Sequence, residues 1–293
     1  MAANKPKKKQ ALRNNEYYST QALFDDLYER SQRGEIFTHL MELIASEQNI
    51  LLAYRAIKKN KGSKTKGVNS TTIVEMGEKQ PEELVAYVRK RLQNFHPHAV
   101  RRVEIPKPDG RMRPLGIPTM EDRIVQQCIK QVLEPICEAK FYKHSYGFRP
   151  NRSAHHAVAR AMFLVNISKY RYVVDVDIKG FFDNVDHGKL LKQLWTLGIR
   201  DKQLLCVLSK MLKAPIQGEG VPTKGVPQGG ILSPLLSNVV LNELDWWIAS
   251  QWEEFPQLQR YRSRPHYKGN GTLKQVYLVR YADDFKLFCK CRG

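Results

Sequence analysis

Two segments of this chain that read as β-strands carry aspartates inside otherwise apolar runs. The first, YRYVVDVDI, holds Asp175 and Asp177, and the second, VYLVRYADDFKLF, holds Asp283 and Asp284. Side chains alternate between the two faces of a strand, so Asp175 and Asp177 share one face. Adjacent residues point to opposite faces, so Asp283 and Asp284 can approach one ion only at the bend of a hairpin. The sequence therefore predicts an acidic strand and, far along the chain, an acidic hairpin.

The order of the other expected elements favours one fold class. Helical periodicity begins at Ser19 and continues in a longer stretch from Thr38 to Ile57, and a hairpin, VRRVEIPK and RPLGIP, follows around the turn PDG. Later helices are predicted to start at Thr119, Ser153, Asp186, Asp201 and Ser233. Strands and helices do not alternate regularly, which argues against a doubly wound sheet. We predict an α+β fold in which helices cover an antiparallel sheet.

The charge of the chain indicates a polyanionic partner. Lysine and arginine outnumber acids by 48 to 29, a net charge of +19, which attracts nucleic acid, with an anionic membrane surface as the alternative. Residues 1–15 contain five basic residues and no acid, so we expect a basic arm or a solubilising tail. Neither a signal peptide nor an apolar run of roughly 20 residues is present. We expect an intracellular protein, in the cytoplasm or an organelle interior, without membrane association.

The strand-borne carboxylates need a compensating charge, because a carboxylate on a half-buried strand is costly on its own. A lysine or arginine partner is the usual structural explanation, and a divalent cation is the other. Magnesium prefers hard oxygen ligands and is held by one or two carboxylates with substrate phosphates. An isolated Asp-Asp pair is a weak signal, but two acidic strands on a strongly basic protein favour metal-dependent phosphoryl transfer on nucleic acid.

A loop rich in glycine and proline lies between the two acidic segments. TKGVPQGGILSPLLSN joins three glycines and two prolines to the start of a helix. Such a loop lets backbone approach a ligand closely. A tight turn that begins a helix explains it equally well.

Several blocks together resemble one protein family. YADD, DIKGFFDNVDH and GVPQGGILSPLLSN resemble reverse transcriptases, and EIPKPDGRMRPLGIPTMEDRIVQQ with YGFRPNRSAHHAV resembles the kind that group II introns encode. The resemblance implies a right-hand polymerase fold with fingers, an antiparallel palm sheet packed with helices, and a helical N-terminal extension. By this resemblance, residues 1–60 form the basic arm and the extension, 61–170 the fingers with parts of the palm, and 171–293 the palm with the catalytic motifs. The family continues into a thumb and a maturase region, so we expect a fragment that is weakly active or inactive alone.

The resemblance also assigns catalytic groups that spacing alone leaves open. It implies that Asp177, and not Asp175, binds metal together with Asp283 and Asp284, and that the carbonyl of Ile178 contacts the nucleotide-side ion. Two Mg²⁺ ions are expected, with Mn²⁺ as the alternative. The implied reaction is attack of a primer 3′-hydroxyl on an incoming dNTP with departure of pyrophosphate.

A nucleotide pocket is implied by the same resemblance. Lys107 and Arg113 match basic residues that grip the triphosphate, and Phe182 matches a ring that excludes ribonucleotides, with Phe181 as the second choice. The full set is Lys107, Arg113, Phe181, Phe182, Gln228 and Ala282.

Contacts with nucleic acid are expected from basic residues outside this pocket. Five lysines in the loop KKNKGSKTKG suit a phosphate backbone. The set is Lys58, Lys59, Lys61, Lys64, Lys66, Arg101, Arg111, Arg149 and Arg152. The expected partners are group II intron RNA, a DNA primer or target DNA, and dNTPs, and a homodimer is left open.

Two functions follow from the resemblance. The first is an RNA-directed DNA polymerase that copies intron RNA and assists splicing and mobility. The alternative is a non-enzymatic maturase fragment that binds intron RNA as a splicing cofactor. Intact Asp177, Asp283 and Asp284 favour the polymerase, because a maturase that had lost polymerisation would be free to replace them.

Overall fold

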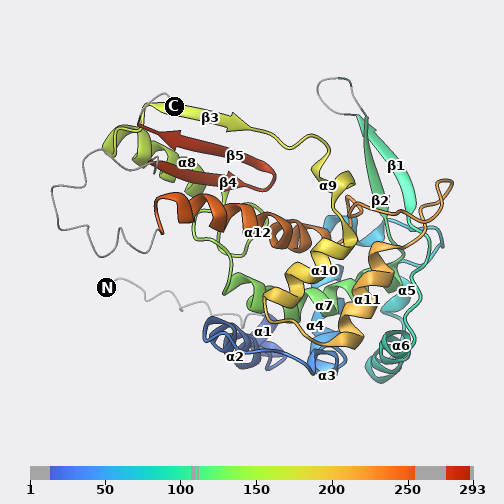
Figure 1. The fold of residues 1–293 in the computed structure, drawn as a ribbon. Helices are drawn as coiled ribbons and strands as arrows, with labels where there is room; N and C mark the ends of the chain where they lie inside the picture. The colour runs from blue at the N-terminus through green and yellow to red at the C-terminus, as the bar shows by residue number, and fades with distance from the viewer. Residues whose placement is uncertain (1–13, 107–109, 111, 255–274, 291–293) are drawn as a thin grey trace, which may run out of the picture.

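The computed structural model describes residues 14–106, 110, 112–254 and 275–290, which form a helical body and a small sheet beside it (Figure 1). The helices are α1 (Asn14–Tyr17), α2 (Gln21–Gln32), α3 (Leu40–Ile44), α4 (Glu47–Lys58), the 3-10 helix η1 (Lys61–Lys64), α5 (Ile73–Met76), α6 (Pro81–Gln93), α7 (Met120–Glu138), α8 (Ala154–Met162), the π-helix η2 (Phe163–Ile167), α9 (Phe181–Asn184), α10 (His187–Thr196), α11 (Lys202–Leu212) and α12 (Ser233–Gln251). The strands are β1 (Arg101–Pro106), β2 (Met112–Ile117), β3 (Tyr172–Val176), β4 (Val276–Tyr281) and β5 (Asp284–Cys289).

Helix α7 lies at the centre of the helical body. It contacts α2, α3, α4, α6 and α12, and its apolar side chains, such as Ile124, Ile129 and Val132, are fully buried. The core around it runs from Leu27 to Leu241. Helices from all three segments expected from the sequence thus share one core, and the boundaries at 60 and 170 stay a prediction.

One long helix expected from the sequence is in fact two helices. The chain breaks between α3 and α4, where Ser46 is the N-cap of α4 and its hydroxyl accepts from the backbone nitrogen of Asn49 at 3.4 Å. The buried amide of Asn49 donates to the carbonyls of Ile44 and Cys128 at 2.9 and 3.0 Å. The break is therefore anchored on α7, a contact that helical periodicity does not reveal.

The other helix starts lie close to their expected positions. Thr119, Asp186 and Asp201 are N-caps whose side chains accept a backbone hydrogen bond. Ser153 occupies the N-cap without such a bond, and Ser233 is the first residue of α12 rather than its cap. No helix in the described ranges is long and apolar enough to cross a membrane.

The sheet has the order β3-β5-β4 and is antiparallel throughout. Leu278 and Phe285 face α12, where they pack on Ile248. On the other face, Val279 and Phe288 pack with the region of α8 and η2. The antiparallel sheet between helices confirms the predicted α+β class.

The hairpin of β1 and β2 stands apart from this sheet (Figure 1). Its base is fixed by three backbone hydrogen bonds, from Val100 N to Pro215 O at 2.7 Å, from Gln217 N to Val100 O at 2.9 Å and from Gly116 N to Gln228 O at 2.6 Å. Farther out, large apolar side chains such as Ile105 are exposed. The predicted hairpin is confirmed by the register of β1 on β2.

Candidate active site

The acidic residues from the two distant segments meet at one end of the sheet. Ala282 and Asp283 form the two-residue turn between β4 and β5, and Ala282 has a left-handed backbone, φ +59°. The register of β3 on β5, extended by one residue, sets Asp177 opposite Asp284. The predicted hairpin bend is therefore confirmed, and it faces the end of the acidic strand.

Asp175 and Asp177 share a face but differ in their surroundings. Asp175 lies opposite Lys286, and its Oδ2 is 2.7 Å from the ammonium nitrogen. Asp177 makes no hydrogen bond or ion pair with any residue in the described ranges. The ion-pair explanation thus holds for Asp175, and Asp177 is left without a protein cation.

Negative charge accumulates at the turn. Partial burial raises the pKa of Asp284 above its ordinary value, and the carboxylates of Asp283, Asp177 and Asp175 raise it further against the opposing effect of Lys286. Within the described part of the chain, no three His, Cys, Asp or Glu side chains are already arranged as ligands of one ion. The aspartates thus concentrate negative charge at the turn, but their side chains are not arranged as a complete set of ligands around one ion.

A cavity of about 610 Å³ opens in front of these acids. Its walls come from β2, from the segment between β3 and α9, from the glycine-rich loop before α12, and from the β4–β5 turn. The predicted site residues that line it are Arg113, Asp177, Ile178, Phe181, Phe182, Gln228, Asp283 and Asp284. Its size is that of a pocket for a small ligand. A larger cavity, of about 1110 Å³, lies between α2, α7 and α8, away from Asp177, Asp283 and Asp284, so the smaller cavity is the candidate active site.

The two adjacent rings of α9 differ in burial. Phe181 is 7% exposed and belongs to the helical core, whereas Phe182 is half-buried. Their rings meet edge to face with centroids 5.3 Å apart. Both reach the cavity, but Phe181 also carries part of the packing.

A glycine of the TKGVPQGG loop lets this loop lie directly against the backbone of β2. Gly229 has φ +108°, and a Cβ at this position would lie 2.7 Å from the carbonyl oxygen of Gly116 on β2. Beside it, Gln228 accepts the hydrogen bond of Gly116 described above. The loop thus joins the base of the β1–β2 hairpin to the start of α12.

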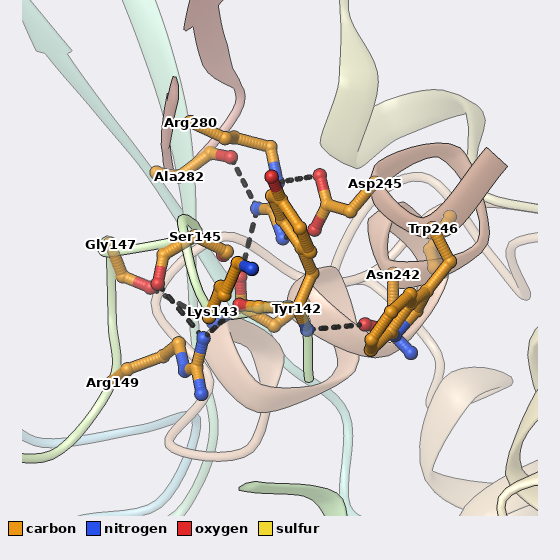
Figure 2. A network of polar contacts seen from close by, with 12 residues as sticks. Tyr142, Lys143, Ser145, Gly147, Arg149, Asn242, Asp245, Trp246, Arg280 and Ala282 are labelled. Carbon is orange, nitrogen blue, oxygen red and sulfur yellow. Dashed lines mark hydrogen bonds and ion pairs between the residues drawn. The ribbon is translucent and has the colours of Figure 1, made fainter. Parts of the chain in front are cut away.

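A buried arginine, Arg280, connects the β4–β5 turn to α12 (Figure 2). Arg280 is 1% exposed, and its guanidinium donates to both carboxylate oxygens of Asp245 at 2.7 and 2.6 Å. It also donates to the carbonyl of Ala282 at 2.7 Å and to Asn238 Oδ1 at 2.9 Å. Burial raises the pKa of Asp245, and Arg280 opposes that shift. Since Asp245 and Asn238 lie on α12, the arginine ties the turn that carries Asp283 to that helix.

Residues 144–147 also contact the β4–β5 hairpin next to its turn. Their backbone exchanges two hydrogen bonds with Arg280, at 3.1 and 2.9 Å, and Asn238 donates to the carbonyl of Gly147 at 2.9 Å. A Cβ at Gly147 would lie 2.1 Å from the backbone nitrogen of Ala282. Ala282 is buried there and does not line the cavity, which argues against the predicted contact of its side chain with a nucleotide.

Arg149 was expected to contact nucleic acid, but its side chain is enclosed by protein. The guanidinium binds the Glu138 carboxylate at 2.8 to 3.0 Å and donates to the carbonyls of Tyr142 and Ser145 at 2.7 and 2.9 Å. Every nitrogen is used and the residue is 6% exposed, which argues against that role. Arg152 stays partly exposed, and its contact remains a prediction.

The remaining basic residues lie at the surface. The lysines of the KKNKGSKTKG segment, which forms the end of α4 and η1, are all exposed. Arg101 donates to the carbonyl of Lys66 at 3.1 and 2.8 Å, which places it beside them. Lys107 and Arg111 lie outside the described residues.

Three features of the site were missed by sequence reasoning. Lys179 and Asp183 line the cavity, and their position inside DIKGFFD was a usable signal. Phe148 also lines it, but nothing in YGFRP marks its direction. Arg280 occupies a position that alternates with buried Leu278, so a charge there required a partner, yet the sequence did not say which.

Comparisons with known proteins show what this chain is similar to. The family model for reverse transcriptase (RNA-dependent DNA polymerase) matches residues 105–292. Protein YkfC of Escherichia coli (strain K12) is 36% identical over 269 residues, which cover 86% of this chain and 70% of that protein. The group II intron-encoded protein LtrA of Lactococcus lactis subsp. cremoris is 35% identical over 255 residues, 85% of this chain and 42% of that protein. A solved structure, the partial Cas6-RT-Cas1–Cas2 complex, has a TM-score of 0.49 and 24% identity and covers 87% of this chain and 39% of that one.

The family model matches well over half of the chain, in the part that contains the acids and the cavity. The chain belongs to the reverse transcriptase family, and its relatives include a group II intron-encoded protein. The resemblance drawn from the motifs is thereby confirmed. The chain spans less than half the length of LtrA.

Proposed function

We propose that this chain is the fingers and palm of an RNA-directed DNA polymerase that copies group II intron RNA into DNA. The three-stranded sheet is the palm, and the β1–β2 hairpin belongs to the fingers. The observation that carries the proposal is that Asp177, Asp283 and Asp284 line one cavity that Arg113 of the β1–β2 hairpin also lines. Carboxylates without an ion-paired partner and an arginine thus border the same cavity, as binding a nucleotide and its metal requires.

The acids fit divalent cations. The carboxylates of Asp177, Asp283 and Asp284 offer hard oxygen donors beside one cavity, and none of the three has a hydrogen-bonded or ion-paired partner among the described residues. With the carbonyl of Ile178, they would hold Mg²⁺, or Mn²⁺ as the alternative. Bound ions supply activation of the primer hydroxyl and stabilisation of the leaving oxygen. Arg113, with Lys107 outside the described residues, would hold the triphosphate of the dNTP.

Phe182 is our choice for the ring that selects deoxyribonucleotides. It is more exposed than Phe181, whose ring packs in the core. Phe182→Ala should increase ribonucleotide incorporation and cost less stability than Phe181→Ala, for which we expect a loss of about 3 to 5 kcal/mol. If only the Phe181 change relaxes sugar selection, the assignment of the two rings is reversed.

Primer extension on an RNA template tests the proposed activity. Asp177→Asn, Asp283→Asn and Asp284→Asn should each lower the rate by more than the roughly ten- to hundredfold that partners of metal ligands cost. Asp175→Asn is the matched control, because it removes a carboxylate from the same face that already has Lys286 as its partner. An equal loss in the control, or full activity in the other variants, would remove the metal assignment.

The exposed lysines of the KKNKGSKTKG segment favour a second function, intron RNA binding in support of splicing. Cations at an RNA backbone release counterions, so the affinity should fall as salt rises, with a slope of roughly −0.7 per phosphate contact for single strands. Replacing the five lysines with alanine should flatten that slope. Asp283→Asn should leave RNA binding unchanged, and a variant that lost both together would argue against two separable activities.

A further inference from the structure

Phe148 is a third aromatic side chain at the wall of the active-site cavity, and neither the motifs nor the proposed chemistry uses it. The ring is 49% exposed, and it lines the cavity together with Asp283 and Asp284. An exposed phenylalanine at a catalytic cavity leaves apolar surface in water unless a ligand covers it. The ring is therefore open to contact with a ligand in the cavity.

The backbone at Phe148 is in a conformation that a bulky residue rarely adopts. Its φ is +59°, in the left-handed region, where side chains other than those of glycine, asparagine and aspartate are uncommon. Such strain persists only where the surroundings determine the backbone, and it concentrates at functional sites.

The residues on both sides of Phe148 are fixed by contacts described above. Gly147 is held against the backbone of Ala282, and its carbonyl accepts from Asn238. Arg149 is locked to Glu138. Since neither neighbour can shift without breaking these contacts, the ring is presented to the cavity by a backbone that the β4–β5 turn itself positions.

The chemistry of the cavity indicates what the ring would contact. Carboxylates and Arg113 account for metal and phosphate, and the flat apolar surface of a nucleobase still needs a partner. Stacking on an aromatic side chain accepts any base, because every base has a π-face. We propose that Phe148 stacks on a nucleobase of the base pair at the reacting end of the duplex and so positions it beside the acids. This inference rests on the proposed function.

Photocrosslinking tests the contact without requiring catalysis. The chain is bound to a primer–template whose primer lacks the 3′-hydroxyl and so cannot be extended. The photoreactive base 5-iodouracil is placed at one of three positions: in the incoming nucleotide, as 5-iodo-dUTP, at the templating position, or at the primer end. Irradiation followed by peptide mapping should give a crosslink at Phe148 from at least one placement, and that placement identifies the base. Phe148→Ala should abolish this crosslink. No crosslink at Phe148 from any placement overturns the proposal.

Kinetics give the second readout. Phe148→Ala should raise the KM for every dNTP, or lower the affinity for primer–template, by on the order of tenfold. Phe148→Trp should retain most of the binding. Phe163→Ala is the matched control, since Phe163 is 48% exposed but does not line the cavity. Phe148→Gly, which relieves the left-handed backbone, should lose binding as Phe148→Ala does; a glycine variant with normal binding would show that the ring is not the contact.

The two hypotheses fail in different ways. A Phe148 crosslink in a chain that does not extend primers would argue against the polymerase and leave the stacking contact standing. Normal extension by Phe148→Ala, with unchanged KM and affinity, would remove the contact and leave the polymerase standing.

Discussion

The β1–β2 and β4–β5 hairpins both consist of two six-residue antiparallel strands and both border the active-site cavity, but the fold holds them differently. β4–β5 lies between α8 and α12, pairs with β3, and has its turn tied down by Arg280. β1–β2 is fixed by backbone hydrogen bonds at its base, and its outer residues Ile105 and Met112 are 45% and 49% exposed.

The difference matches the charges that each hairpin carries. The carboxylates sit on the hairpin that is held from both faces, and Arg113 sits on the one that is anchored only at its base. Under the proposed function, fixed carboxylates would be organised before a metal binds, whereas an arm with few buried contacts would open and close at low cost. Substitutions in the two hairpins should therefore differ in what they cost in stability.

Arg280→Met should have the largest effect. It leaves Asp245 as a buried carboxylate without a partner, which costs about 3 to 5 kcal/mol, measured as the free energy of unfolding in urea. The double variant with Asp245→Leu should recover much of this loss. Lys286→Ala removes the exposed ion pair to Asp175 and should cost at most about 1 kcal/mol. A similar cost for Lys286→Ala would mean that the buried ion pair of Arg280 does not stabilise the turn more than the exposed ion pair of Lys286 does.

Gly147→Ala compared with Gly110→Ala should show an intermediate effect. At Gly147 the added Cβ meets the backbone of Ala282, so the turn must shift, at about 1 to 3 kcal/mol and with a drop in primer extension. Gly110, between β1 and β2, has φ +79° and open space around it, so alanine should cost only about 1 kcal/mol. Equal losses of extension in both variants would contradict the contrast.

Acidification should weaken the support of the palm sheet. Burial on its own raises the pKa of Glu253, next to α12, but hydrogen bonds from His144, Tyr142 and Lys143 outweigh it and lower the pKa to about 2. The folded pKa lies below the unfolded value, so this stability is present above about pH 4.5 and is lost as the pH falls toward 2. In thermal melts over that window, Glu253→Gln should lose less stability than the wild type. Parallel curves would show that Glu253 contributes nothing.

Arg113→Ala should have the smallest effect on folding. The residue is exposed on the loosely held hairpin, so the free energy of unfolding of the variant should match that of the wild type within the roughly 0.5 kcal/mol typical of surface changes. The KM for dNTPs should nevertheless rise, because the side chain lines the cavity. A stability loss without a change in KM would place Arg113 in the packing of the hairpin instead.

Sequence reasoning reached the acids because their geometry is local. Alternation along a strand and the bend of a hairpin place Asp283 and Asp284 without any knowledge of the rest of the fold. It did not predict the ion pair between Arg280 and Asp245, because Asp245 lies on α12, a helix that only the folded chain brings next to the turn. The break before Ser46 was missed for the same reason, since Asn49 binds a carbonyl on α7. Phe148 was missed because its direction follows from a left-handed backbone that phenylalanine itself does not favour.

The order of the strands has a consequence for how the site forms. The central strand of the sheet, β5, follows both of its neighbours in the chain, and β3 precedes it by about a hundred residues. During synthesis β3 therefore has no partner in this sheet until β5 has emerged, while the local contacts of the helices can form earlier. Non-local pairing of this kind is slow, so the helical body should fold first and the carboxylates should converge last. Until then Val173 and Val174 lie on an unpaired strand, and that interval is when the chain is most open to aggregation.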